Sequence, residues 1–288
     1  MFMPEQPLKN SPSKIPSARE LLRRYDLKAK KSLGQNFLAD PRIAQKIVAL
    51  SGLPEEKIVV ELGVGLGTLT YALAQKAQKV IGFELDQNLI EILEKESFLT
   101  PTVEIRHGDI LKLDYHALSE EIGQKLILFG NLPYYLSSRL LWELIQSRKN
   151  IDFCVFMFQK EVAERLLARP GHKNYGPLSI LLALTAETEK LMDLSPGCFY
   201  PPPEVRSSLI KIKFLNDSLP NEKKLLQVLK ASFANRRKKL ATNLRALDLS
   251  KDEARNLLEE IDISPDARAE ELPPEKFLAL AEKLSKDG

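Results

Sequence analysis

Cysteine is scarce in this 288-residue chain, and long apolar runs are missing. The two cysteines, Cys154 and Cys198, are isolated from one another, which argues against a disulfide framework and a cysteine-based metal knuckle. No stretch approaches the roughly 18 consecutive apolar residues that predict a membrane-spanning helix. The first 32 residues also lack the apolar core of a secretory signal. We therefore expect a cytoplasmic protein with reduced thiols, no metal and no membrane partner.

The net charge of the chain is also small. The 42 lysines and arginines face 39 aspartates and glutamates, and a net charge of +3 does not by itself predict a nucleic-acid partner. The charges are nevertheless unevenly spread. Residues 1–31 carry eight basic side chains against three acidic ones, and residues 221–245 carry eight against the single Glu222. Two basic segments therefore flank a more neutral middle.

Residues 1–30 are polar, contain four prolines and show no apolar periodicity before Ala18. This composition predicts a flexible basic N-terminal arm. Asp40 and Pro41 then precede an apolar pattern at helical spacing that continues to Leu50. Because Asp is a favoured helix N-cap and Pro a favoured first helical residue, we predict a helix that begins here.

Residues 57–159 alternate short β-branched runs with helical periodicities. The predicted strands are IVVELG, KVIGFELD, VEIRHGDI, KLILFGN and FCVFMFQ, with helices near Thr68, Asn88 and Ser137. This alternation predicts an α/β fold with a mainly parallel sheet covered by helices on both faces. Residues 181–191 and 207–214 are predicted to pair as an antiparallel edge.

The pattern changes at Asn216, after which apolar residues recur only at helical spacing. A chain of this length also exceeds the usual single domain of roughly 100–200 residues. We therefore predict a larger α/β domain over residues 31–215 and a smaller all-α domain over residues 216–288.

A glycine-rich turn, ELGVGLGT, occupies residues 61–68 between a predicted strand and a helical pattern. The dinucleotide fingerprint requires a third glycine at the sixth position, where this chain has Thr68, so the turn does not favour NAD. S-adenosylmethionine has no pyrophosphate, and its adenosine and amino-acid parts can lie against Gly63 and Gly65, because glycine permits close backbone approach. The alternative is a purely structural turn.

Two carboxylates follow the next two predicted strands. Glu84 ends the strand at residues 79–85, where it can accept hydrogen bonds from both ribose hydroxyls of an adenosine. Asp109 follows the next strand and can accept a hydrogen bond from an adenine amine. Either acid alone is more often a solvated loop residue. Together with the glycine turn, however, they form three ligand-binding features at consecutive strand ends.

The sequence Asn131-Leu132-Pro133-Tyr134 follows the fourth predicted strand. An adenine amine is a poor nucleophile because its lone pair is delocalised into the ring. The side-chain oxygen of Asn131 and the carbonyl of Leu132 can accept its two hydrogens, while Pro133 keeps the preceding residue extended. Tyr134 offers a ring for stacking, which contributes about 1–3 kcal/mol per base. The pattern predicts methyl transfer to adenine in RNA, and the alternative is a loop with a capping Asn.

With further landmarks, these motifs resemble those of the ribosomal RNA adenine dimethylases, specifically the bacterial enzymes that dimethylate two adjacent adenines near the 3′ end of small-subunit rRNA. The resemblance covers about residues 30–246, and its landmarks are SLGQNFL, ELGVGLG, ELD, GD, NLPY, QKEV, YG, FYPPPEV and FANRRK. The resemblance implies a Rossmann-like class I methyltransferase sheet flanked by helices, with S-adenosylmethionine as the cofactor.

The resemblance also implies roles for single residues and a partner. It implies a cofactor site made by Asn36, Leu38, Gly63, Glu84, Asp109 and Asn131, with Gln35 at the entrance. Phe199 is implied to be the second aromatic that sandwiches the target adenine, although without the family pattern it reads as an ordinary buried aromatic. The implied partner is small-subunit rRNA in a partly assembled 30S particle, bound by a monomer.

A basic cluster lies in the predicted helical domain. Its members are Arg236, Arg237, Lys238 and Lys239. Alone they are interpreted as a solvated helix face. Beside an RNA-modifying site, however, they are predicted to bind phosphates and to fix the register of the RNA.

Three other functions stay open at this point. A small-molecule methyltransferase would share the glycine turn and the acids, but would not require NLPY together with the basic cluster. A large-subunit rRNA dimethylase that confers antibiotic resistance is distinguished mainly by FYPPPEV and FANRRK. A non-enzymatic assembly or transcription factor on the same fold is disfavoured because all the proposed acceptor residues are present. After NLPY the chain departs from the family, with Tyr135 where Asn is frequent.

Overall fold

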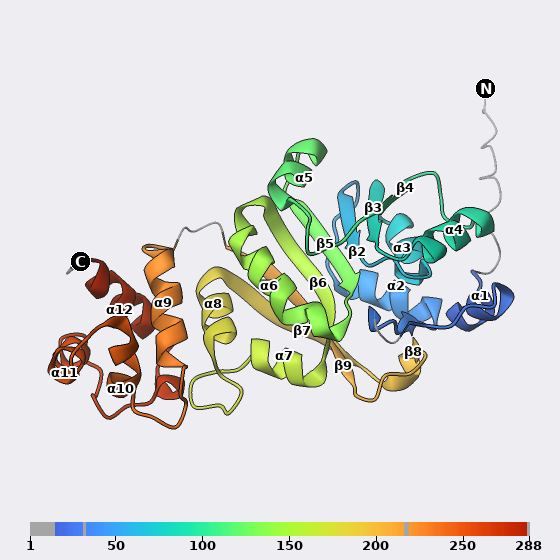
Figure 1. Ribbon diagram of the computed structural model, residues 1–288. Helices are drawn as coiled ribbons and strands as arrows, with labels where there is room; N and C mark the ends of the chain where they lie inside the picture. The colour runs from blue at the N-terminus through green and yellow to red at the C-terminus, as the bar shows by residue number, and fades with distance from the viewer. Residues whose placement is uncertain (1–14, 31–32, 216–218, 287–288) are drawn as a thin grey trace.

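The computed structural model describes residues 15–30, 33–215 and 219–286 (Figure 1). Within these residues its centre is a seven-stranded sheet in the order β4-β3-β2-β5-β6-β9-β7. The strands are β2 (Ile58–Leu62), β3 (Lys79–Glu84), β4 (Val103–His107), β5 (Leu126–Asn131), β6 (Ile151–Gln159), β7 (Ala186–Leu194) and β9 (Ser207–Phe214). β2 to β6 pair in parallel, and β9 lies antiparallel between β6 and β7. The predicted mainly parallel sheet is confirmed.

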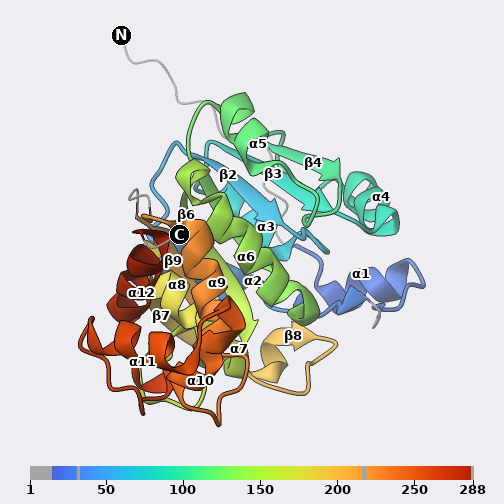
Figure 2. The ribbon, with the colours of Figure 1, turned by 60° about the vertical axis from the view of Figure 1, so that its left-hand side comes forward.

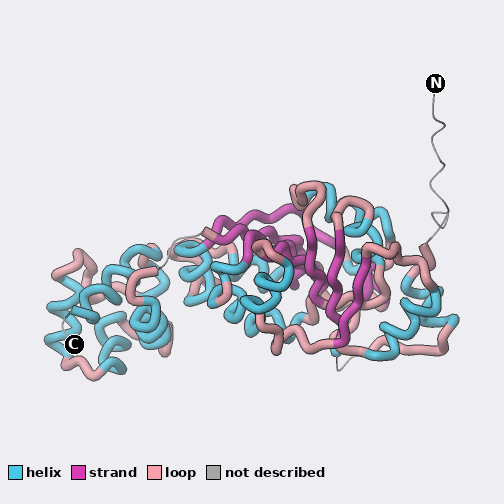
Figure 3. Tube along the Cα trace, turned by 90° about the horizontal axis from the view of Figure 1, so that it is seen from above, coloured by secondary structure: helices cyan, strands magenta, loops and turns pink. Residues whose placement is uncertain are grey.

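Helices cover both faces of this sheet (Figure 3). They are α2 (Pro41–Leu50), α3 (Thr68–Ala74), α4 (Gln87–Glu96), α5 (Tyr115–Ile122), α6 (Ser137–Gln146), α7 (Lys160–Leu166) and α8 (Pro177–Thr185). Val59 and Val80 pack against α2 and α3, whereas the alternate residues Val60 and Ile81 belong to the core formed with α5, α6 and α8. Because both faces of the central strands are buried, their sequences are nearly continuous apolar runs.

Most predicted element boundaries agree with the structure, with one clear exception. Asp40 caps α2, since its Oδ1 accepts a hydrogen bond from the N–H of Arg42 at 2.9 Å. The strand predicted over residues 181–191 is wrong at its start, because α8 continues to Thr185 and β7 begins at Ala186. The start of that segment is uniformly apolar, and such a run does not distinguish a buried helix from a strand.

The predicted flexible arm is wrong for residues 15–30. Helix α1 (Ala18–Arg24) begins with a capping box. Leu21 is fully buried in a cluster shared with α4, and Arg24 pairs with a glutamate at the end of α4 at 2.6 Å. A small apolar face on this short helix is therefore sufficient to fix it against the sheet domain, despite its polar composition. Residues 1–14 of the predicted arm lie outside the described residues.

The chain beyond the sheet is helical, which confirms the predicted smaller all-α part (Figure 2). It contains α9 (Glu222–Ser232), α10 (Leu240–Leu244), α11 (Lys251–Glu259) and α12 (Pro274–Lys286). The ring of Phe233 contacts that of Tyr175 edge to face and that of Phe277 at a tilt, with centroids 6.4 and 5.8 Å apart. The Tyr175 hydroxyl donates to the Leu272 carbonyl at 2.9 Å. These contacts attach the helical part to the loop before α8. Among the described helices none has the length and apolarity needed to cross a membrane.

Candidate functional site

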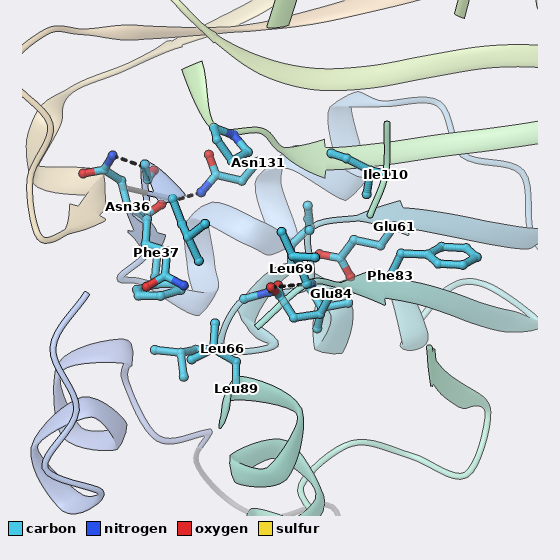
Figure 4. A pocket seen from close by; sticks show the side chains of 18 of the residues that line it. Asn36, Phe37, Glu61, Leu66, Leu69, Phe83, Glu84, Leu89, Ile110 and Asn131 are labelled. Atoms are coloured by element: carbon cyan, nitrogen blue, oxygen red, sulfur yellow. Dashed lines mark hydrogen bonds between the residues drawn. The ribbon is translucent and has the colours of Figure 1, made fainter. Parts of the chain in front are cut away.

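The carboxyl ends of β2, β3 and β5 and the loop after β4 meet in one pocket (Figure 4). Parallel strands place the loops that follow them at the same edge of the sheet, so residues distant in sequence come together. Every residue assigned to the cofactor lines this pocket: Gln35, Asn36, Leu38, Gly63, Gly65, Glu84, Asp109 and Asn131. The first three arrive beside the sheet because β1 (Phe37–Leu38) pairs with β8 (Phe199–Tyr200).

The glycine turn after β2 adopts left-handed backbone angles that favour glycine. The angle φ is +82° at Gly63 and +59° at Gly65. A Cβ atom on Gly65 would lie 2.9 Å from the ring of Phe37, so this glycine allows the turn to pack against β1. A Cβ atom on Gly63 would meet nothing within 4 Å. The backbone at Gly63 is therefore open to close approach by a ligand in the pocket.

Glu84 is a fixed hydrogen-bond acceptor at the end of β3. Its Oε2 accepts from the N–H of Gly65 at 2.8 Å, and its Oε1 accepts from the N–H groups of Leu85 and Asp86 at 2.8 and 2.9 Å. The residue is 8% exposed, and these bonds offset the cost of burying it. Because each carboxylate oxygen can accept two hydrogen bonds, Oε2 can also accept one from a ligand hydroxyl.

Gln35 is held beside the pocket by Asp86, the N-cap of α4. Its Nε2 donates to Asp86 Oδ2 at 3.1 Å, and Lys30 Nζ pairs with the same carboxylate at 2.8 Å. Burial raises the pKa of Asp86, but hydrogen bonds from Lys30 and Gln35 outweigh burial and lower it. Asp109 lies in the loop after β4, where its Oδ1 accepts from the N–H of Leu111 at 3.0 Å. Asp86 thus fixes Gln35 beside the pocket, whereas Asp109 is held within its own loop.

Asn131 is the last residue of β5, the strand next to β2. Its Nδ2 donates to the backbone carbonyl of Asn36 at 2.6 Å, as Figure 4 shows. This contact directs the donor end of the amide toward β1. The other end, Oδ1, is the acceptor, so the side chain is oriented to receive a hydrogen bond from a donor in the pocket.

The residues after Asn131 form a tight turn. The side chain of Leu132 is 2% exposed and packs into the core, while Pro133 lines the pocket. The Pro133 carbonyl accepts from the N–H of Leu136 at 3.0 Å and closes a 3₁₀ turn. The side chain of Tyr134 lies outside the part of the chain that the structure describes. The roles of the Leu132 carbonyl and the Tyr134 ring stay predictions.

The pocket also contains a buried carboxyl group, that of Glu61, which the sequence did not predict as a site residue. Glu61, on β2, is 1% exposed, and its Oε2 makes no hydrogen bond within the described residues. Burial raises the pKa of Glu61 to about 8, opposed by the nearby Thr70 hydroxyl and assisted by the charge of Glu84. The signal that could have identified it is an acid at the end of an apolar strand, directly before the glycine turn.

Phe199 does not lie in the pocket. Its place in β8 opposite Leu38 turns its ring into the core shared with α2, where the residue is 3% exposed. Burying a phenylalanine side chain contributes about 1.5–3 kcal/mol, which accounts for this position. The predicted stacking of Phe199 on the target adenine is therefore not seen. It stays a prediction that requires the ring to leave this core.

The basic cluster lies on the loop between α9 and α10, rather than on a helix face. Its members Arg236, Arg237, Lys238 and Lys239 are all exposed. The loop is fixed by Asn243, whose Nδ2 donates to the carbonyls of Ser232 and Asn235 at 2.7 and 2.9 Å. Lys239 pairs with Asp266 at 2.7 Å, whereas the other three members form no ion pair within the described residues. Three unpaired cations on a fixed loop suit a polyanionic partner.

The groups in the pocket fit an adenosine-based ligand. Ribose hydroxyls and an adenine amine are hydrogen-bond donors, and Glu84 and Asp109 present carboxylates to receive them. The open backbone at Gly63 leaves room for the rest of such a ligand. Among the described residues, no group of three His, Cys, Asp or Glu side chains is arranged to hold a metal ion.

Comparisons with known proteins agree with this geometry. The family model described as ribosomal RNA adenine dimethylase matches residues 26–286. The chain is 39% identical over 274 residues to ribosomal RNA small subunit methyltransferase A of Syntrophus aciditrophicus, with 93% of this chain and 98% of the relative covered. A solved dimethyladenosine transferase from Plasmodium falciparum is 29% identical, with a TM-score of 0.76 and coverage of 88% and 98%.

A solved 23S rRNA methyltransferase, ErmE, shares the fold. It is 22% identical, with a TM-score of 0.65 and coverage of 87% of this chain and 100% of that one. The family model and the small-subunit relative both extend over most of this chain, including the pocket and the helical part. The chain belongs to the ribosomal RNA adenine dimethylase family.

Proposed function

We propose that this protein is an S-adenosylmethionine-dependent enzyme that dimethylates the N6 amines of two adjacent adenines in a loop near the 3′ end of small-subunit (16S) rRNA. The observation that carries the proposal is the orientation of Asn131. Its donor end is engaged by Asn36 at 2.6 Å, so its acceptor end can receive an adenine amine beside the cofactor pocket.

The chain's own residues supply binding and alignment. When bound, S-adenosylmethionine supplies an electrophilic methyl group. Glu84 Oε2 would accept a hydrogen bond from a ribose hydroxyl, and Asp109 would accept one from the adenine amine of the cofactor. Asn131 and the Leu132 carbonyl orient the target amine so that its lone pair is directed toward the methyl group. Alignment of this kind lowers the barrier without a general base.

The relatives' names support the small subunit as the source of the substrate. Ribosomal RNA small subunit methyltransferase A is 39% identical to this chain over almost its full length. ErmE, named for 23S rRNA, is similar in fold alone. We therefore favour the small-subunit substrate over a large-subunit substrate linked to antibiotic resistance, and an enzyme over a non-enzymatic assembly factor.

We also propose which part of the chain binds which ligand, and in what state the protein meets its substrate. Residues 31–215 bind the cofactor, and residues 216–288 bind RNA. The protein acts as a monomer on a partly assembled 30S particle during small-subunit biogenesis, in the cytoplasm where ribosomes are built.

The experiment that tests this proposal offers the purified protein three substrates lacking the methyl groups. These are naked small-subunit rRNA, partly assembled 30S particles and mature 30S particles, each with labelled cofactor. We expect the fastest incorporation with partly assembled particles. Equal rates on naked rRNA would remove the particle from the proposal, and label in large-subunit particles alone would support the rival substrate.

Glu84→Ala is expected to weaken S-adenosylmethionine binding by about five- to 150-fold. Loss of a hydrogen bond to a ligand in a partly buried site costs about 1–3 kcal/mol. Titration calorimetry measures the affinity, and urea unfolding checks that the variant is folded, since Glu84 also holds the Gly65 N–H. The matched control is Glu187→Ala, an exposed glutamate on β7. An unchanged affinity in a folded Glu84 variant would remove Glu84 from the site.

Replacing Arg236, Arg237 and Lys238 with serine is expected to flatten the salt dependence of RNA binding. Each phosphate contact contributes about 0.7–0.9 to the slope of log affinity against log salt, so loss of three contacts reduces the steepness of the slope by about 2–3. Binding is measured from 50 to about 200 mM salt. A charge-matched control replaces the exposed lysines Lys46, Lys57 and Lys95. If both triple variants keep the native slope, the cluster is only a solvated surface.

A further inference from the structure

Tyr135 is an exposed aromatic side chain at the rim of the cofactor pocket. It is 61% exposed and lines the pocket with Pro133 and Leu136. In the part of the chain that the structure describes, four large apolar side chains are exposed; Tyr135 is the most exposed of them, and Leu85, 48% exposed, also lines this pocket. Exposed apolar side chains that gather at one opening mark a place where a partner binds.

The turn that carries Tyr135 is anchored on both sides. Leu132 and Ser137 on either side of it are buried, and the hydrogen bond from Leu136 N–H to the Pro133 carbonyl closes the turn between them. Gly34 borders the ring: a Cβ atom there would lie 3.6 Å from Tyr135 Cδ1. Within the described residues no aromatic ring or cation stacks on Tyr135. The ring therefore lies beside Gly34 at the rim with much of its surface uncovered.

The position of the ring indicates what covers it. Tyr135 follows Asn131 by four residues, on the β5 side of the pocket, whereas Glu84 ends β3 and Leu85 follows it, on the other side of β2. The rim near Tyr135 therefore belongs to the side where the target amine is held. An adenine that enters the pocket loses its stacking on the neighbouring base, and that neighbour is left at the rim with an uncovered face.

We propose that Tyr135 is a stacking platform for the base next to the adenine that is being methylated. This inference rests on the proposed function and deepens it. Stacking on Tyr135 replaces the contact that the neighbouring base loses, and it holds the second of two adjacent adenines close to the pocket. Tyr135 is thus a positioning residue for RNA and makes no contact with the reacting atoms.

The test compares Tyr135→Ala with Tyr135→Phe, which keeps the ring and removes only the hydroxyl. Two readouts are used: kcat and KM on small-subunit particles, and the fluorescence of a hairpin RNA with 2-aminopurine beside the target adenine. Because base–aromatic stacking contributes about 1–3 kcal/mol, we expect kcat/KM for RNA to fall about five- to 150-fold in Tyr135→Ala and to change less than about twofold in Tyr135→Phe. Cofactor affinity, measured by calorimetry, should stay native in both.

The fluorescence readout separates stacking from a structural effect. Binding to the native protein and to Tyr135→Phe should quench 2-aminopurine at the neighbouring position, and binding to Tyr135→Ala should not. Leu50→Ala, which removes an exposed leucine that does not line the pocket, is the control and should leave this quenching intact. Equal quenching by Tyr135→Ala and the native protein, with equal kcat/KM, would overturn the proposal. Failure of the proposed function is distinct, because then the native protein itself forms no dimethyladenine in rRNA.

Discussion

Asn131→Ala is expected to lower the rate of methyl transfer about 10²–10³-fold, by analogy with the loss of one preorganised polar group. In the ground state the adenine amine is nearly planar, and water can satisfy it. As the methyl group arrives, the nitrogen becomes tetrahedral and gains positive charge, so a fixed acceptor stabilises the transition state more than the ground state. RNA affinity should therefore change little.

Single-turnover assays at saturating RNA and cofactor measure this rate. Cofactor affinity must be measured in the same variant, because Asn131 also lines the cofactor pocket and bonds to Asn36. Asn131→Asp keeps an acceptor oxygen but loses the Nδ2 donor to the Asn36 carbonyl, so its rate shows how much the orientation of the amide contributes. The second transfer acts on a bulkier amine with one hydrogen, so the alanine variant should also accumulate monomethyladenine. Transfer at the native rate would contradict this role.

Glu61→Gln is expected to make the protein less sensitive to rising pH. Burial raises the pKa of Glu61 to about 8 from an ordinary value of 4.5. Between these values the folded protein binds a proton that the unfolded chain has lost, so the free energy of unfolding falls as pH rises. This stabilisation is fully present below pH 4.5 and is lost as pH passes through about 8. Glutamine is neutral throughout and resembles the protonated acid.

The expected difference is large for one side chain. A pKa shift of this size changes the free energy of unfolding by about 3–5 kcal/mol between acid and alkaline pH. Because Glu61 is buried, solvent screening reduces this change little. Urea unfolding at pH 5, 7 and 9 tests it: Glu61→Gln should gain stability relative to the native protein at each step. Glu187→Gln, an exposed glutamate, is the control and should follow the native curve. Parallel curves for Glu61→Gln would show that Glu61 is ionised in the folded protein.

The sheet and the pocket edge could be predicted because their signals are local. Short β-branched runs between helical periodicities identified β2 to β6, and a parallel sheet then requires the ends of these strands to lie at one edge. For that reason the sequence alone predicts that Gly63, Glu84, Asp109 and Asn131 belong to one site. The structure brings all four to the same pocket.

Other features could not be predicted because they depend on packing between distant segments. The polar composition of residues 15–30 gave no sign that α1 would find an apolar surface beside α4. Phe199 belongs to a motif, yet the pairing of β8 with β1 directs its ring into the core. The raised pKa of Glu61 follows from burial, which a residue's identity does not reveal. The basic cluster was found by composition, but its place on a loop depends on contacts made by Asn243.

The central claim is that this pocket transfers methyl groups to adenine N6 in small-subunit rRNA. The most direct measurement treats unmethylated small-subunit and large-subunit particles with labelled cofactor and native protein, then identifies the modified nucleosides in nuclease fragments by mass spectrometry. We predict N6,N6-dimethyladenosine at two adjacent positions near the 3′ end of the small-subunit rRNA, with label strongly reduced in Asn131→Ala. Label confined to large-subunit rRNA, or small-subunit rRNA without dimethyladenosine, would contradict the account.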